Sequence, residues 1–588
     1  MADIKSTTNS KVYQIKKWLG VNESPDGDTG LKMGEAAEMR NFKITSENHL
    51  QVRPGYGVYA TLDGENPVLG MWEGYVNGNH HVVASCGGKL WDITNGTAQD
   101  KGELVGDKAF FFGFSDKLYI LTGSEYYSWD GENAPAVVEG YIPVVATAVA
   151  PNGAGTIIEG VNCLTGKRRA DFSPDGTAKE FFLPEKNIKA VVSVTGTTIT
   201  YTTDLAAGKV TFNSAPPAGT NTIEITWDTG KDSRAKIIGM QYAELFNGQT
   251  DSRVFLYGNG TNETVYSGIG EHGVASAEYF PDLNVIAVDS ANTPITAMIR
   301  HYNSLLIFKT DSAYCCEYST LTLNNQVVAA FYTSSLNREI GCTAPGQALL
   351  VNNDARTLYG RSVYDWSLTS NGIRDERNAK RISDRVANTL GSFDFNECLC
   401  FDDEWRQEYY VIYDGKAVVH NYKNDTWYLY TNFPVTSIVS VGERIYFGTK
   451  NGEVMEFSRT YRNDNGDPID AYWASGSMDF EMDWRKKYSS LIWVSIKPES
   501  RAAVYATAES NVKSDYPSKL ISTSLATFTN ASFAHWSFNT NRKPQLVRAK
   551  LKVKKATYYK FVLYSNSTST TATVLNVDFQ VRHTGNVK

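Results

Sequence analysis

Short runs of alternating apolar and polar residues follow one another along most of the chain, and Gly, Asn or Asp stands between them. Such alternation over about four to eight residues is typical of a β-strand with one buried face, and the bounding residues favour turns. Two segments instead have the composition of helices, at 34–41 (GEAAEMRN) and 372–388 (GIRDERNAKRISDRVAN). The pattern therefore predicts an all-β protein with two short helices.

The strands recur in a common order in two stretches, at about 55–150 and 232–458. Each repeat has a polar turn, an aromatic-rich strand, a turn with Asp or Asn beside Gly, and a further strand, as in DKLYILTGSEYYSWDG (116–131). Comparable strands lie roughly 40 to 50 residues apart, which is the period of four-stranded propeller blades. We predict one β-propeller of six or seven blades, divided between these two stretches.

Residues 151–231 interrupt this rhythm. They contain alternating strands such as VTFN and IEITW, with turns at Pro174-Asp175-Gly176 and Pro216-Pro217-Ala218-Gly219. We predict an inserted β-sandwich here, so that deleting residues 155–230 is expected to leave a folded, soluble propeller. Residues 459–588 are predicted to form a C-terminal β-sandwich, and residues 1–54 an N-terminal arm with the first propeller strands.

Composition and charge narrow the function classes. The chain has 588 residues, a formal net charge of −7 and seven cysteines. A general nucleic-acid binder usually has a basic face, so the acidic balance argues against that class, although it is compatible with a channel through which DNA slides. No run approaches the roughly 20 apolar residues of a membrane span, and the N-terminus lacks the apolar core of a signal peptide. We expect reduced, buried thiols and assembly in a cytoplasm.

The candidates for chemistry are few. Asp402, Asp403 and Glu404 are adjacent, but an acidic turn explains them better than the two positioned carboxylates of a glycosidase. Residues 463–467 (NDNGD) loosely match a calcium loop but lack its bidentate Glu, and His80-His81 would point to opposite faces of a strand. The charged run from Arg374 to Arg385 fits a solvated helix better than a ring interface or a DNA-facing surface. We therefore predict no catalytic, cofactor-binding or metal-binding residues, and no enzyme activity.

Three stretches resemble structural proteins of bacteriophage tails and necks. The first lies at 20–56, the second in the predicted inserted sandwich, and the third where the predicted propeller passes into the C-terminal sandwich. Their matching residues are Asn22, Gly34-Glu35-Ala36, Asn41-Phe42 and Arg53-Pro54-Gly55; Asp175-Gly176-Thr177, 182–184 and 210–220; and Asp467-Pro468-Ile469-Asp470 with Tyr472-Trp473.

Within that group the chain is most similar to the nozzle proteins of short-tailed phages, also called tail tubular or packaged-DNA stabilization proteins. The resemblance implies a homo-oligomeric ring, expected to be a hexamer, in the tail or head-tail connector of the virion. Such a ring would contact portal, adaptor and other tail proteins, and would line and close a channel for double-stranded DNA without sequence-specific contact. Two alternatives remain open: a receptor- or carbohydrate-binding tail protein, and a polysaccharide-degrading propeller enzyme.

Overall fold

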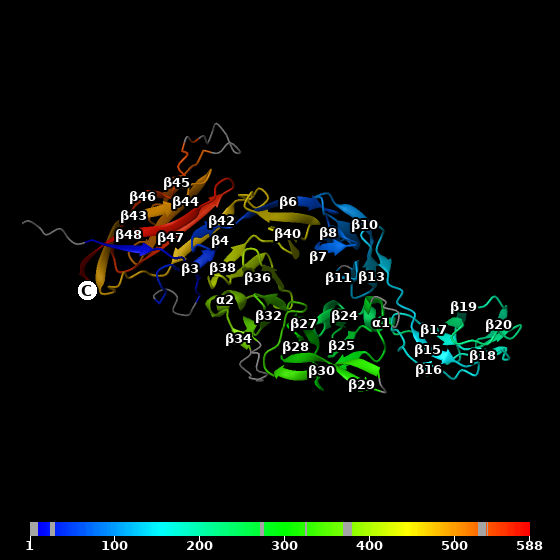
Figure 1. Cartoon of the computed structure of the whole chain (residues 1–588). Helices are drawn as coiled ribbons and strands as arrows, with labels where there is room; N and C mark the ends of the chain where they lie inside the picture. The colour runs from blue at the N-terminus through cyan, green and yellow to red at the C-terminus, as the bar shows by residue number, and fades with distance from the viewer. Residues whose placement is uncertain are drawn as a thin grey trace, which may run out of the picture. The chain divides into compact units, whose positions relative to one another are not determined.

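The protein is built almost entirely of β-strands, which confirms the predicted all-β class (Figure 1). The computed structural model describes residues 10–23, 30–106, 108–270, 276–323, 326–367, 379–526, 537 and 539–587. The described residues divide into two compact units: unit 1 lies within residues 10–68, 349–367 and 379–587, and unit 2 lies within residues 69–348. In the described residues, no helix is long and apolar enough to cross a membrane.

Unit 2 contains four sheets of four strands, and in each sheet the strands follow one another in chain order. Buried aromatic and branched side chains fill the space beside these sheets, as the alternation predicts. The four sheets are β7 (Val68–Val76), β8 (Asn79–Cys86), β9 (Lys89–Asp92) and β10 (Gln99–Glu103); β11 (Phe110–Phe114), β12 (Lys117–Leu121), β13 (Tyr126–Trp129) and β14 (Ala136–Val137); β23 (Tyr242–Asn247), β24 (Thr250–Tyr257), β25 (Glu263–Tyr266) and β26 (Val285–Ala287); and β27 (Ile295–His301), β28 (Ser304–Lys309), β29 (Ala313–Leu323) and β30 (Gln326–Asn337).

Unit 1 contains three more four-stranded sheets. The third of them combines strands from distant parts of the chain, because β6 pairs antiparallel with β41, with Ala60 opposite Val454. The sheets are β31 (Leu349–Val351), β32 (Asp354–Tyr359), β33 (Ser362–Trp366) and β34 (Ala379–Arg381); β35 (Leu399–Asp403), β36 (Glu408–Tyr413), β37 (Lys416–Asn421) and β38 (Thr426–Thr431); and β39 (Ser437–Val441), β40 (Arg444–Gly448), β41 (Glu453–Ser458) and β6 (Gly55–Thr61).

The strands between residues 144 and 228 pair among themselves and share one buried core, which includes Phe172, Phe181 and Trp227. This inserted module is followed by the short helix α1 (Arg234–Ile238). Its two sheets are β16 (Thr156–Ile157), β15 (Val144–Val149), β17 (Lys167–Phe172), β22 (Ile223–Asp228) and β19 (Ala190–Thr195); and β18 (Glu180–Phe182), β21 (Lys209–Phe212) and β20 (Tyr201–Asp204).

The C-terminal module, residues 459–588, also has two sheets, and both contain strands from the N-terminal segment. Figure 1 shows the blue β1 beside the red β48. Trp18 packs edge-on against Trp473 at a ring separation of 4.8 Å, so the N-terminal segment also contributes to the module's core. The sheets are β4 (Phe42–Ile44), β5 (Leu50–Val52), β48 (Thr573–Asn586), β43 (Arg485–Ile496) and β46 (Gln545–Ala556), with β1 (Lys11–Ile15) on β48; and β2 (Gly20–Val21), β3 (Glu35–Arg40), β42 (Ile469–Ser475), β47 (Tyr559–Ser567), β44 (Ala502–Ser510) and β45 (Lys519–Thr523).

Both helix predictions need correction. Residues 35–40 form β3, whose Met39 lies opposite Trp473 in the sheet and is fully buried. Pairing with β42 outweighs the helix propensity of the Ala-Ala-Glu-Met sequence. In the second segment, residues 368–378 lie outside the described residues, β34 follows at 379–381, and only short helical turns occur at Asp384–Val386 and in α2 (Ala387–Leu390).

Candidate functional site

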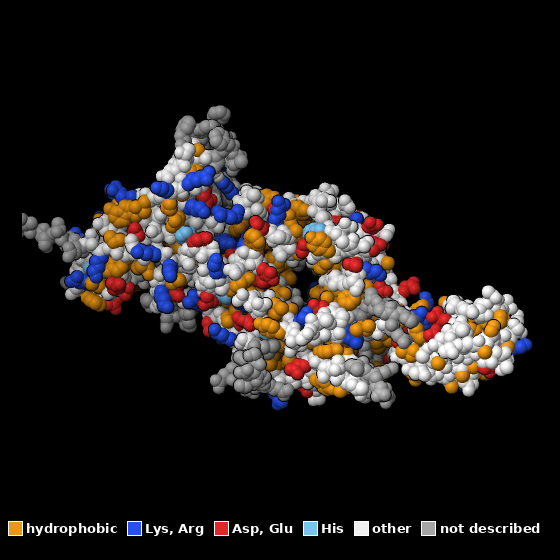
Figure 2. Space-filling view, in the orientation of Figure 1, with side chains coloured by type: hydrophobic (Ala, Val, Ile, Leu, Met, Phe, Trp, Pro, Cys, Tyr) orange, Lys and Arg blue, Asp and Glu red, His pale blue; other side chains and the backbone are white. Residues whose placement is uncertain are grey.

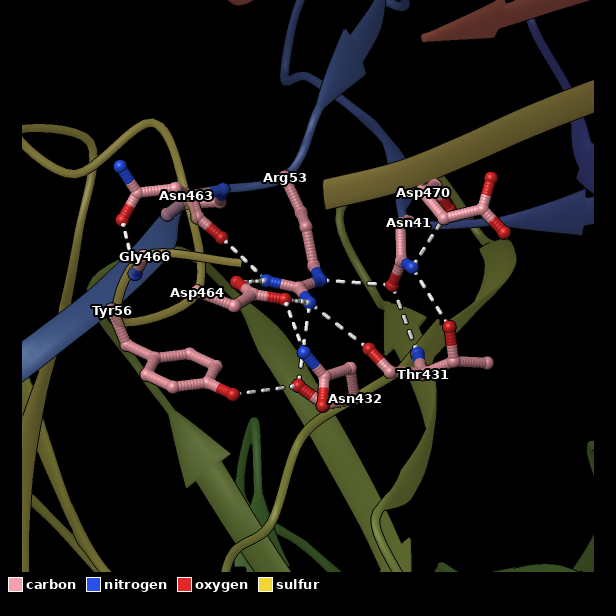
Figure 3. Close-up of polar contacts among 10 residues, drawn as sticks. Asn41, Arg53, Tyr56, Thr431, Asn432, Asn463, Asp464, Gly466 and Asp470 are labelled. Carbon is pink, nitrogen blue, oxygen red and sulfur yellow. Dashed lines mark hydrogen bonds and ion pairs between the residues drawn. The ribbon is translucent and has the colours of Figure 1, made fainter. Parts of the chain in front are cut away.

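A buried ion pair between Arg53 and Asp464 lies in unit 1 and joins segments far apart in the sequence (Figure 3). Arg53 lies between β5 and β6, and Asp464 lies in the loop between β41 and β42. The two side chains are 0% and 1% exposed, respectively. Nη1 donates to Oδ1 at 2.9 Å and Nη2 to Oδ2 at 2.6 Å, which is the paired, planar geometry that only a guanidinium provides.

The remaining N–H groups of Arg53 are also satisfied. Nε donates to Asn41 Oδ1 at 2.8 Å, Nη1 to the carbonyl of Pro54 at 2.8 Å, and Nη2 to the carbonyl of Thr431 at 2.9 Å. Thus all five donors have a partner, which offsets much of the free energy needed to bury the charge. A lysine could not make this set of contacts because its ammonium group lacks the fork.

Asn41 connects the ion pair to two further strands. Its backbone φ is 55°, a left-handed conformation that Asn tolerates better than most residues. The side-chain amide donates to Thr431 Oγ1 at 2.8 Å and to the carbonyl of Asp470 at 2.9 Å, while Oδ1 accepts the N–H of Thr431 at 2.9 Å. The network therefore ties the N-terminal segment to the end of β38 and to the start of β42.

Burial dominates the electrostatics of this network. Burial raises the pKa of Asp464, and the hydrogen bonds and charge of Arg53 oppose that change. The pKa of the Tyr56 phenol is raised by burial and by the negative charge of Asp464, and the neutral hydroxyl donates to the carbonyl of Asn432 at 3.2 Å. Since its polar groups are turned toward one another, this arrangement is suited to holding segments together rather than to acting on a substrate.

The sequence-predicted calcium-like loop is part of this network. The Asp464 carboxylate is bound to Arg53, and Asn463 Oδ1 accepts the N–H of Gly466 at 2.9 Å. These oxygens are therefore committed to contacts that stabilise the loop. Within the described ranges, no group of three or more His, Cys, Asp or Glu side chains is placed to hold a metal ion.

The three adjacent acidic residues do not act as one group. Asp402 and Asp403 end β35, so their side chains point to opposite faces, and Glu404 begins the following turn. Asp403 pairs with Arg406, its Oδ2 lying 2.8 Å from Nη1. Asp402 is near Arg356, yet burial, assisted by the charge of Glu404, raises its pKa to about 7. Of the three residues predicted to form an acidic turn, only Glu404 lies in a turn, because Asp402 and Asp403 belong to β35.

Arg356 is the centre of a second buried polar cluster in unit 1. Its Nη1 lies 3.1 Å from His420 Nδ1, its Nη2 lies 3.7 Å from Asp365 Oδ2, and its guanidinium stacks on the rings of Tyr409 and Tyr422. Burial raises the pKa of Asp365 and lowers that of His420. A carboxylic acid that titrates near neutral pH can donate or accept a proton, so Asp402 is the group in this cluster best suited to acid–base chemistry.

Other residues singled out in the sequence lie apart. His80 contacts Glu73 at 2.8 Å and His81 contacts Asp92 at 3.0 Å, each on its own side of β8. All seven cysteine side chains are buried, as the sequence predicts. In the charged run, Arg374 to Arg377 lie outside the described residues, and Arg381 pairs with Asp384 at 2.7 Å rather than facing Arg385 along a helix.

Comparison with known proteins does not identify a family for this chain. No protein-family model matches the chain, and no curated protein is similar to it in sequence. One solved structure with partial similarity is a crystal structure of a computationally designed protein, Ika8, at 13% identity and a TM-score of 0.34. That match covers 68% of this chain and 99% of the designed chain, and at this TM-score it carries no argument about fold or function.

Proposed function

We propose that this chain is a non-enzymatic structural protein of a bacteriophage tail or neck, and that it assembles into a ring of six copies that lines and closes a DNA channel. One observation carries the proposal. The N-terminal segment is built into the last four-stranded sheet and into both sheets of the C-terminal module. Because strands from the beginning of the chain pair with strands from its end, the protein is suited to transmitting force without unfolding.

The propeller is the fold we propose for the body of the chain. The described residues contain seven sheets of four strands each, in addition to the two modules, so we propose seven blades. β6 completes the sheet of β39–β41, and this is how a propeller can close its ring by pairing an early strand with the last blade. Closure removes the exposed strand edges that would otherwise pair with other chains.

The Arg53–Asp464 network supports the mechanical part of the proposal. It ties β38 and β42 to the N-terminal segment through groups that are almost fully buried. A ring built from copies of this protein would guide DNA by the shape of its channel and would need no base-specific contact. Portal, adaptor and other tail proteins would be the neighbours of such a ring, and the virion, assembled in the host cytoplasm, its location.

Exposed aromatic side chains favour one alternative, a receptor- or carbohydrate-binding tail protein. Trp405 is 66% exposed at the turn after β35, and Trp484 is 58% exposed just before β43. Aromatic rings of this kind can stack on sugars. The raised pKa of Asp402 is the feature that would matter to a polysaccharide-degrading enzyme, since a glycosidase uses one carboxyl as an acid.

Electron microscopy of the purified protein tests the proposal. We expect closed rings, and we expect these rings to dock onto portal–adaptor complexes of a short-tailed phage. A chain that stays monomeric at micromolar concentration and cleaves capsular polysaccharide would be an enzyme instead. A monomer that binds polysaccharide without cleaving it, and loses binding in a Trp405→Ala or Trp484→Ala variant, would establish the carbohydrate-binding alternative.

A further inference from the structure

The charge of the chain is divided unevenly. The C-terminal module has 19 Lys and Arg residues against 10 Asp and Glu, whereas residues 1–458 have 38 against 54. Figure 2 shows Lys and Arg side chains gathered over the part of unit 1 where β43 to β46 lie. The module is therefore strongly basic within an acidic chain, which the net charge alone conceals.

Much of this excess lies on one strand, β46. Arg548, Lys550, Lys552, Lys554 and Lys555 are exposed, while Ala549, Leu551 and Val553 between them are buried. Lys552 and Lys555 have φ values of 58° and 57°, and the register against β43 shifts beside each of them. These irregularities are β-bulges, which turn extra side chains outward. We call these five side chains the basic stripe.

The basic stripe has no ion-pair partner among the described carboxylates. The inserted module differs, because Lys209 pairs with Glu180 at 2.7 Å, Lys167 with Glu139 at 3.4 Å and Lys189 with Asp228 at 3.4 Å. The positive charge of the stripe is thus left uncompensated in the folded chain, which favours an anionic partner from outside.

Neighbouring strands add to the same face. Tyr488 on β43 lies between Lys554 on one side and the exposed Arg582 of β48 on the other. Half-buried Trp493 lies in the same way between Arg548 and Asp578, so this face also carries one carboxylate, two strands away from the stripe. Lysines and bulges on an edge strand also prevent unwanted strand pairing, but that role concerns β46 alone, whereas Arg582 lies on β48, two strands from β46.

We propose that the basic stripe, with Arg582, binds the phosphate backbone of double-stranded nucleic acid. Protein–protein interface cores are depleted in Lys, whereas interfaces with DNA are strongly positive, so the composition favours nucleic acid over a protein partner. Alternate residues such as Arg548 and Lys550 are about 6.8 Å apart along a strand, and the bulges at Lys552 and Lys555 add further cations to the same exposed row. This inference does not depend on ring formation, since one copy carries the whole surface.

A titration with a fluorescent duplex of about 30 base pairs and mixed sequence tests the inference. We expect salt-dependent binding, with each phosphate contact adding about 0.9 to the slope of log K against log salt. The variant Lys550→Gln/Lys552→Gln/Lys554→Gln should bind at least about tenfold more weakly, with a slope lower by about 2 to 3. The matched control Lys167→Gln/Lys189→Gln/Lys209→Gln removes three paired lysines and should bind like the parent chain.

Two results would overturn the inference. One is equal affinity and equal salt slope for the stripe variant, the control variant and the parent chain, with all three equally folded by circular dichroism. The other is self-association without DNA binding that is salt-dependent and is lost only in the stripe variant, because the stripe would then dock on an acidic surface of a second copy. Since binding is measured on dilute single copies, a failure to form rings leaves this test intact.

Discussion

The inserted module and the C-terminal module are both two-sheet β structures with aromatic cores, but they are assembled differently. All strands of the inserted module come from one continuous stretch, residues 144–228. The C-terminal module instead takes β1 to β5 from the beginning of the chain and the rest from after residue 468. The inserted module is therefore completed by neighbouring residues alone, whereas the C-terminal module is complete only when strands from both ends of the chain pair.

This difference shows which of the two modules depends on contacts between distant parts of the chain. Contacts between distant residues must repay the entropy of closing a long loop, so the C-terminal module needs strong, specific contacts at its junction. The Arg53–Asp464 pair and Trp18 provide them. The inserted module has no such requirement, and its Lys189 and Lys209 pair with carboxylates of the module itself.

Removing residues 1–52 should have the largest effect. The deletion takes away strands from both sheets of the C-terminal module together with the buried Trp18. We expect residues 459–588 to lose protease resistance and the near-ultraviolet circular dichroism of their aromatic core. A protease-resistant C-terminal fragment from the truncated chain would show that the module folds without its N-terminal strands.

Asp464→Ala should destabilise unit 1 by about 3–5 kcal/mol, because it leaves the buried Arg53 charge without its partner. Chemical denaturation followed by tryptophan fluorescence measures this. Asp470→Ala is the control, since its side chain pairs with Arg40 at 2.9 Å on the surface, where such a pair is worth at most about 1 kcal/mol. Similar losses in the two variants would contradict the special role of the buried network.

Asp402 should make stability depend on pH. Its pKa in the folded chain is about 7, above the ordinary value of 3.8, so the folded state binds this proton more tightly than the unfolded state. The contribution is therefore complete below about pH 4 and is lost as the pH rises through 7. Asp402→Asn should remove this dependence and stabilise the chain by about 1–3 kcal/mol at pH 8.

Stability curves at pH 4.5, 6, 7 and 8 for the parent chain, Asp402→Asn and Glu404→Gln measure that dependence. Glu404 is exposed at the adjacent turn, so its variant should retain most of the pH slope. A parent chain whose unfolding free energy is constant from pH 4.5 to 8, relative to Asp402→Asn, would mean that Asp402 is already ionised in the fold.

Excising residues 167–228 should have the smallest effect. The N–H of Thr229 donates to the carbonyl of Gly166 at 3.0 Å, so the two cut ends lie close enough to be joined, and only β15 and β16 of the module remain, without their partner β17. We expect the thermal midpoint of the remainder to change by only a few degrees. The wider deletion of 155–230 also removes Asn162 and Leu164, which contact the core of unit 2, and it should be clearly more harmful.

The sequence predicts the class of the fold well because alternation is a local signal. The repeating strands around LYILT and YYVIY are present as β12 and β36. The helix predicted at 34–41 is wrong because Ala36 and Met39 belong to β3, which pairs with β42, a strand more than 400 residues later in the chain. No local pattern contains that information, and propensity alone favours a helix.

The buried network could be anticipated only in pieces. Asn41, Arg53 and the residues around Asp467 were each singled out by resemblance, but their contact with one another was not. The available signal was a charged Arg53 between Val52 and Pro54, in a stretch otherwise suited to burial, because such a charge needs a partner. The sequence does not say which of the 64 acidic residues that partner is. The basic stripe was hidden for a different reason, since the net charge of −7 averages over it.

Native-state hydrogen exchange on the intact chain tests the central claim, that the two ends form one structural unit, most directly. The account predicts that amides of β1, β4 and β5 exchange with the same opening free energy as those of β43 and β48, and that Asp464→Ala lowers all of them together. If the N-terminal strands instead exchange several kcal/mol more easily than β43 and β48, the N-terminal segment is an appended arm and the account is wrong.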